Sequence, residues 1–126
     1  MKTDQSIEDY LEAILVLGAG GGDVHQIAVA KRLGVSQPAV TKAVRKLKEL
    51  GYIETEGMHI ILTAAGRARA DAVYARHCDI REFLILLGVG AAEAECDACR
   101  MEHVIGDATY AAIKKYLNGQ SKRLEQ

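Results

Sequence analysis

The fold of this chain is decided by one stretch of its sequence, Ile27-Ala-Val-Ala-Lys-Arg-Leu-Gly-Val-Ser-Gln-Pro-Ala-Val-Thr-Lys-Ala-Val-Arg-Lys-Leu47. Ala30 is small enough to let two helices cross closely, and Gly34 can make a tight turn between them. After the turn, an apolar residue recurs at i, i+4 and i+7 from Val40, which gives one apolar helix face. The stretch therefore predicts a helix-turn-helix.

Further elements are predicted on both sides of this motif from apolar periodicity and from residues that cap or break helices. Before the motif, we expect a helix capped by Ser6, a flexible glycine-rich turn at 18–22, and Asp23 as the cap of the next helix. After it, two short strands with a turn between them predict a hairpin, the wing. Thr63 is expected to cap a long helix. The expected elements are helices at 6–17, 24–33 and 37–50, strands at 52–54 and 59–62, helices at 64–86, 91–105 and 107–117, and a frayed tail at 119–126.

The predicted fold class is mainly α with a small β-hairpin wing. We expect a winged helix-turn-helix at 1–63, followed by a helical domain at 64–126. The composition, with 49% hydrophobic and 26% charged residues, is typical of a globular protein, and no apolar window of ~18 residues predicts a membrane span. Because the start of the chain does not resemble a signal peptide, we expect a cytoplasmic location and no disulfide framework among Cys78, Cys96 and Cys99.

The second helix of the motif carries the residues expected to meet DNA. Between Val24 and Leu50, six basic residues stand against the single acidic Glu49, although the net charge of the whole chain is -1. A run of lysines is often only a solvated helix face, but here it lies on a helix that would enter the major groove. The amide and hydroxyl side chains could reach base edges, and the cations would hold phosphates. The expected DNA-binding residues are Ser36, Gln37, Pro38, Thr41, Lys42, Arg45 and Lys46.

A second pattern, Cys99-Arg-Met-Glu102-His103, predicts a metal site. It places a thiol, a carboxylate and an imidazole at i, i+3 and i+4, on one face of a helix, and all three are metal-ligand types. The alternative interpretation of this pattern, without a metal, is a surface patch with a buried cysteine. An acidic pair on the first helix and a histidine on the long helix add candidates, although each alone is more often ordinary surface or structural. The candidate ligands are Asp9, Glu12, His77, Cys99, Glu102 and His103.

Several motifs occur in the same order, and with the same spacing, as in a known family. They are Ser6 to Tyr10 followed by Leu-Glu, the helix-turn-helix with Ser36-Gln-Pro, Leu62-Thr-x-x-Gly66, Arg76-His77, Glu82-Phe-Leu84 and Asp97-Ala-Cys-Arg-Met-Glu-His-Val104. Over about residues 4–117, the chain resembles the diphtheria toxin repressor and manganese transport regulator family, in its short two-domain form. The resemblance implies a homodimeric repressor that binds operator DNA when loaded with metal, with a helical second domain that dimerises.

The resemblance also implies roles for the candidate ligands. Asp9 and Glu12 match the acidic pair of the manganese-responsive branch, whereas Cys99 matches the thiolate of the iron-responsive branch. Three positions match ligands of both branches: His77, Glu102 and His103. This mixture implies Fe²⁺ or Mn²⁺, with Co²⁺, Ni²⁺ or Zn²⁺ able to bind in vitro. We expect one good site per subunit, with a second one that would share Glu12 and Glu102. The ancillary site of the iron branch looks lost, because Arg81 and Glu95 replace a glutamate and a histidine.

Two other functions are open to these residues. Cys96 and Cys99 lie at i, i+3, so a metal-independent winged-helix regulator could sense thiol oxidation through them. Carboxylates, a thiol and imidazoles could also activate water in a small metalloenzyme, or buffer metal. Catalysis is disfavoured because no nucleophile, phosphate loop or substrate-pocket motif accompanies them. We therefore expect no enzyme, no membrane partner and no organic small-molecule substrate.

Overall fold

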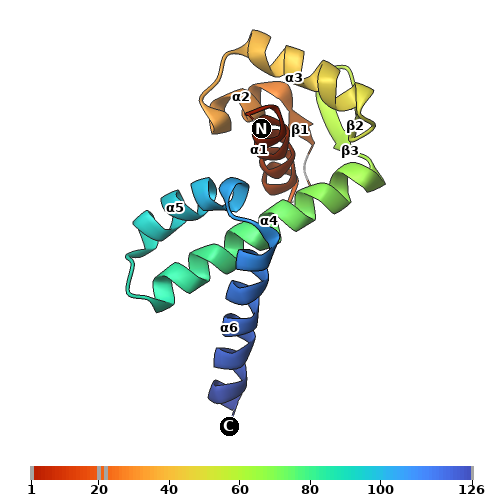
Figure 1. The fold of residues 1–126 in the computed structure, drawn as a ribbon. Helices are drawn as coiled ribbons and strands as arrows, with labels where there is room; N and C mark the ends of the chain where they lie inside the picture. Colours follow the sequence, from red (N-terminus) through yellow and green to blue (C-terminus); the bar gives the residue numbers. More distant parts are fainter. Residues whose placement is uncertain (1, 20, 22, 126) are drawn as a thin grey trace. The chain divides into compact units, whose positions relative to one another are not determined.

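The computed structural model describes residues 2–19, 21 and 23–125 (Figure 1). These residues divide into two compact units, 1–72 and 73–126, with the boundary inside helix α4. Gly20 and Gly22 of the expected glycine-rich turn, and Gln126 of the expected tail, lie outside the described residues. The elements are α1 (Lys2–Gly18), β1 (Val24–His25), α2 (Gln26–Leu33), α3 (Gln37–Glu49), β2 (Ile53–Glu56), β3 (His59–Leu62), α4 (Ala64–Leu86), α5 (Ala91–Val104) and α6 (Asp107–Glu125).

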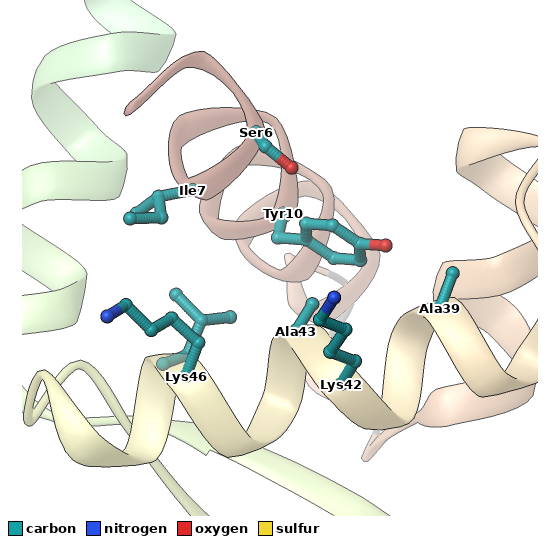
Figure 2. A pocket seen from close by; sticks show the side chains of 8 residues that line it. Ser6, Ile7, Tyr10, Ala39, Lys42, Ala43 and Lys46 are labelled. Atoms are coloured by element: carbon teal, nitrogen blue, oxygen red, sulfur yellow. The ribbon is translucent and has the colours of Figure 1, made fainter. Parts of the chain in front are cut away.

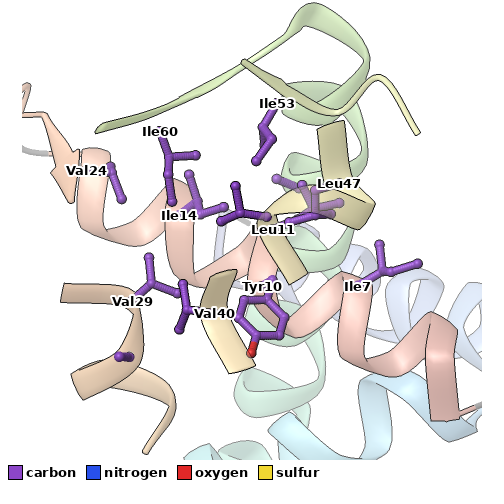
Figure 3. Packing of buried hydrophobic residues seen from close by; sticks show 13 residues of the cluster. Ile7, Tyr10, Leu11, Ile14, Val24, Val29, Val40, Leu47, Ile53 and Ile60 are labelled. Atoms are coloured by element: carbon purple, nitrogen blue, oxygen red, sulfur yellow. The ribbon is translucent and has the colours of Figure 1, made fainter. Parts of the chain in front are cut away.

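The first unit is built on an apolar core that helices α1, α2 and α3 share with the sheet (Figure 3). Leu11 of α1, Val29 of α2 and Val40 of α3 are at most 1% exposed. Ile53 and Ile60 reach the same core from the strands. Burying an aliphatic side chain of this size stabilises a fold by about 1.5–3 kcal/mol, so the core fixes how α3 is held against α1.

The turn between α2 and α3 forms as the sequence predicts. Gly34 ends α2 in the left-handed conformation, with φ 67°, and its N–H donates to the carbonyl of Ala30. Ser36 then caps α3, because its Oγ accepts a hydrogen bond of 3.2 Å from the backbone N–H of Ala39. The helix-turn-helix is confirmed, and α3 presents a buried face and an exposed face along its length.

The wing is a three-stranded antiparallel sheet in the order β1-β3-β2, rather than a hairpin alone. Its third strand is the pair Val24–His25, which was expected to be helical. Val24 pairs with Ile60 of β3, and the extended backbone that this pairing requires delays the start of α2 to Gln26. The cap of α2 is therefore not Asp23 but His25, whose Nδ1 accepts a hydrogen bond of 3.1 Å from the N–H of Ile27.

Two helix limits also differ from the prediction. Helix α1 begins at Lys2, so Ser6 lies inside the helix and is not its cap. No glycine or proline precedes Ser6, and nothing in that segment stops the helix from extending. Helix α6 continues to Glu125, although a frayed tail was expected from Gly119 onwards. A single glycine costs a helix interior about 1 kcal/mol, and here it does not end the helix.

The start of α4 is tied to the end of α3 by a close approach of backbones. Thr63 caps α4 as expected: its Oγ1 accepts from the N–H of Gly66 at 3.1 Å and donates to the carbonyl of Gly51 at 2.6 Å. A Cβ at Gly66 would lie 1.9 Å from the carbonyl oxygen of Tyr52. Only glycine fits at this position.

The second unit consists of the carboxyl-terminal half of α4 together with α5 and α6. Helix α5 turns back alongside α4 (Figure 1), and a small core joins the three helices through Ile80, Ala98, Ile113 and Leu117. Arg76 of α4 donates to the carbonyl of Ile105, in the turn between α5 and α6. These contacts fix the rotation of α4 and α5 about their axes, and so decide which polar side chains meet between them.

Candidate functional site

Three of the predicted ligands meet between α4 and α5, inside the second unit. Nδ1 of His77 lies 3.1 Å from Oε2 of Glu102, and Nε2 of His103 lies 3.3 Å from Oε1 of the same carboxylate. The side chains of His77, Glu102 and His103 are 7%, 1% and 2% exposed. Helix α4 supplies the first residue and α5 the other two, so packing of the two helices assembles the cluster.

Polar atoms in this cluster are buried without hydrogen bonds. Among the described residues, Nδ1 of His77 and both carboxylate oxygens of Glu102 have no hydrogen-bond partner. A buried carboxylate that accepts no hydrogen bond costs several kcal/mol, and a cation bound to its oxygens would offset that cost. Carboxylate oxygens and imidazole nitrogens are also ligands that divalent transition metals accept. The donor set fits a metal ion.

The ionisation of His77 reflects the same surroundings. The nearby carboxylate of Glu102 is the main cause that raises the pKa of His77 from 6.5 to about 9. Burial works in the opposite direction, and Glu95 adds to the rise. Without a metal, a proton therefore occupies the position beside Glu102 at neutral pH, and a metal ion would have to displace it.

Outside the predicted ligand set, Glu95 contacts the other side of His77, and Arg81 contacts Glu95. Nε2 of His77 and Oε1 of Glu95 are 2.8 Å apart, and Nη1 of Arg81 donates to Oε2 of Glu95 at 3.1 Å. The sequence showed both positions only as departures from a family pattern. A signal was present in the spacing of His77 and Arg81, which lie four residues apart and so on one face of α4.

The other candidate ligands come from α1 and from another position on α5. Asp9 and Glu12 are half-buried side chains one turn apart on α1, in the first unit. Cys99 is an exposed thiol on α5. Their participation in a metal site stays a prediction.

The predicted DNA-binding residues all lie on the exposed side of α3 or at its start. Ser36 is engaged as the cap of the helix, and the hydroxyl of Thr41 donates to the carbonyl of Gln37 at 3.1 Å. Thr41 can therefore offer DNA only the acceptor side of its hydroxyl. The side chain of Gln37 and the basic residues project from the same face, which suits contact with base edges and phosphates.

A hollow of about 440 Å³ lies between α1 and α3 beside this face. Figure 2 shows Lys42 and Lys46 rising from α3 toward Tyr10 and Ile7 of α1. Lysine stems often cover apolar surface in this way while the ammonium groups remain in water. The two lysines thus present their charges at the edge of α3, next to the helix that carries Asp9 and Glu12.

A winged helix-turn-helix with a basic exposed helix, joined to a helical unit with a buried carboxylate–imidazole cluster, defines a class: DNA-binding regulators that respond to a metal ion. Comparison with known families agrees. Residues 2–59 match the iron dependent repressor N-terminal DNA-binding domain, and residues 63–123 match the iron dependent repressor metal-binding and dimerisation domain. The chain belongs to the iron-dependent repressor family of metal-dependent transcriptional regulators, as its motifs indicated.

Individual relatives support this membership. The chain is 38% identical to the transcriptional regulator MntR of Escherichia coli O6:H1 over 87% of its own length and 72% of that protein. It is 33% identical to the iron-dependent repressor IdeR of Mycobacterium tuberculosis over 88% of its length and 49% of that protein. A manganese-dependent transcriptional repressor solved with manganese matches with a TM-score of 0.81 and 32% identity, over 89% of this chain. The chain spans about half of that solved chain, 52%.

None of the helices in the described part of the chain is long and apolar enough to cross a membrane. The relatives named above are regulators rather than enzymes.

Proposed function

We propose that this chain represses transcription by binding operator DNA as a homodimer when it is loaded with Fe²⁺ or Mn²⁺, and that it controls genes for metal uptake. The observation that carries the proposal is the buried cluster of His77, Glu102 and His103, in which Nδ1 of His77 and both carboxylate oxygens of Glu102 lack hydrogen bonds. The choice of ions is supported by the relatives, which are named as an iron-dependent and a manganese-dependent repressor. Such a regulator acts on chromosomal DNA, so we place it in the cytoplasm.

The proposed ligand set includes residues beyond this cluster. Carboxylates of Asp9 and Glu12 would complete an oxygen-rich sphere that suits Mn²⁺, whereas the thiol of Cys99 would favour Fe²⁺. A second ion would share Glu12 and Glu102. Helix α1 packs directly on α3 through the core of the first unit, so an ion that holds α1 also constrains the recognition helix.

The metal would act by linkage. An ion that binds the DNA-competent arrangement roughly 100-fold better than the open one biases the equilibrium by about 2.7 kcal/mol. Part of the free energy of metal binding would thereby stabilise the DNA-competent orientation of α3.

The dimer is supported by the surface of the second unit. Large apolar side chains that are exposed there among the described residues are Ile85, Leu86, Leu87, Val104 and Tyr116. Exposed apolar side chains that form a contiguous patch often mark an interface between protein chains. In a dimer, the two recognition helices would contact half-sites about 34 Å apart, one turn of B-DNA, or a multiple of it.

The test is DNA binding by the wild type and by Glu102→Gln and His103→Ala, with Mn²⁺ or with Fe²⁺ under anaerobic conditions. A suitable duplex is one that the metal-loaded wild type selects from a random pool. We expect the wild type to need metal, and both variants to lose the metal response while they keep wild-type circular dichroism. Glu93→Gln, an exposed carboxylate in the first turn of α5, is the matched control. Variants that respond to metal as the wild type does would refute the assigned site.

The same titration separates the thiol alternative. Cys96 and Cys99 are both exposed, so an oxidant can reach them. DNA affinity that falls with peroxide and ignores a chelator would favour oxidation sensing over metal sensing.

A further inference from the structure

We propose that Glu95 and Arg81 are positioning residues for the metal centre: they hold the imidazole of His77 so that Nδ1, and not Nε2, is offered to the metal. The inference rests on the proposed function, since it requires His77 to be a ligand. It assigns a role to two residues that belong to no predicted ligand set.

The argument begins with the two nitrogens of the ring. Nε2 of His77 lies 2.8 Å from Oε1 of Glu95. An ionised carboxylate accepts hydrogen bonds but cannot donate one. Nε2 must then carry the proton, and in the neutral ring Nδ1 is left with its lone pair. Nδ1 lies on the opposite side, buried and 3.1 Å from Oε2 of Glu102. The ring therefore presents its available nitrogen to the buried carboxylate.

Arg81 explains why Glu95 holds this orientation. The side chain of Glu95 is 53% exposed, and water alone would allow its carboxylate to rotate. Nη1 of Arg81 lies 3.1 Å from Oε2 of Glu95, so each carboxylate oxygen has its own partner. His77 and Arg81 are one helical turn apart on α4, and Glu95 comes from α5. The guanidinium of Arg81 thus holds the carboxylate of Glu95, and this carboxylate holds the imidazole of His77 beside the buried cluster.

An ion pair between Arg81 and Glu95 with only a structural role would not need to orient the ring of His77. Carboxylates that accept the second N–H of a metal-ligating histidine fix the tautomer and the ring orientation, and their loss typically costs 10–100-fold in metal affinity. Because Glu95 is half exposed and water can partly replace it, we expect the lower end of that range. The charge of Arg81 also makes Glu95 a poor place for a second cation.

The test uses Mn²⁺ alone for affinity and Zn²⁺ as a diamagnetic probe for spectroscopy. Mn²⁺ affinity is measured by competition with a fluorescent chelator for the wild type, Glu95→Ala, Glu95→Gln and Arg81→Ala. We expect Glu95→Ala to bind about 10-fold more weakly. Glu95→Gln should recover most of the loss, because its amide oxygen can still accept from Nε2. Glu93→Gln changes an exposed carboxylate in the first turn of α5, outside the cluster, and should bind Mn²⁺ as the wild type does.

Imidazole ¹⁵N spectra of the Zn²⁺-loaded protein provide the second readout, which a merely structural role would not move. We expect the wild type to show a protonated Nε2 and a metal-bound Nδ1 at His77, and Glu95→Ala to lose the slow exchange of the Nε2 proton. Metal on Nε2 of His77, or Mn²⁺ affinity of Glu95→Ala within twofold of the wild type, would overturn the inference. A wild type that binds metal and responds to it in DNA binding would still leave the proposed function standing in that case. A wild type that takes up no metal would overturn both.

Discussion

Glu102 is the residue on which the metal centre depends most. Its carboxylate is 1% exposed and lies between the imidazoles of His77 and His103. The Cys-x-x-Glu-His pattern predicted that Glu102 and His103 would share a helix with a thiol. It could not predict the contact of His77 with Glu95, because that contact depends on how α4 and α5 are rotated against each other in the core.

The ionisation of His77 predicts a pH dependence in the metal-free protein. Its pKa is raised from 6.5 to about 9, chiefly by Glu102 and against burial. A raised histidine pKa contributes stability that is complete below pH 6.5 and is lost as the pH rises through about 9. We therefore expect the free energy of unfolding in chelator to fall over this window, as measured by urea denaturation.

Glu102→Gln provides the control for this pH dependence. Removing the carboxylate removes the main cause of the raised pKa, so the fall in stability between pH 6.5 and about 9 should be smaller in the variant. A wild type whose stability changes no more than that of Glu102→Gln over this range would contradict the assignment.

At the scale of elements, local signals were sufficient for most of the fold. Gly34 and Ser36 delimit the helix-turn-helix, and Thr63 caps α4, because each acts through neighbours within a few residues. Strand β1 could not be predicted, since it consists only of Val24–His25 and depends on pairing with β3, more than thirty residues away. Sequence periodicity does not contain that information.

The junction of α3, the wing and α4 predicts a strong effect at Gly66. Gly66→Ala would place a Cβ 1.9 Å from the carbonyl oxygen of Tyr52, and the backbones would have to separate. We expect a loss of about 1–3 kcal/mol in the free energy of unfolding. Gly119→Ala is the matched control in α6, where a Cβ meets nothing within 4 Å, and it should stabilise by about 0.5–1 kcal/mol. Equal effects at the two positions would exclude the close approach.

The exposed face of α3 predicts two separable effects on DNA binding. Lys46→Gln removes a phosphate contact, so it should weaken binding to all sequences alike and reduce the slope of log affinity against log salt by about 1. Gln37→Ala removes a proposed base contact, so it should mainly relax sequence preference. Affinities over a salt series, for the selected duplex and for a scrambled one, distinguish the two. A salt slope that Lys46→Gln leaves unchanged would remove this residue from the interface.

At the scale of the whole molecule, the charge distribution is more informative than the net charge of -1. Basic side chains gather on α3 in the first unit, and a carboxylate with two imidazoles is buried in the second. The family resemblance supplied what composition could not, namely that the two features belong to one switch. The physiological ion depends on ligand softness and on metal availability together, and the sequence determines only the first of these.

The central claim is that metal binding and operator binding stabilise each other. Thermodynamic linkage requires the effect to be reciprocal, so the most direct measurement is Mn²⁺ affinity with and without the selected duplex, beside duplex affinity with and without Mn²⁺. We predict that both affinities rise by the same factor, of the order of 100-fold, and that Glu102→Gln abolishes both effects. Metal affinity that is indifferent to DNA, or DNA affinity that is indifferent to metal, would contradict the account.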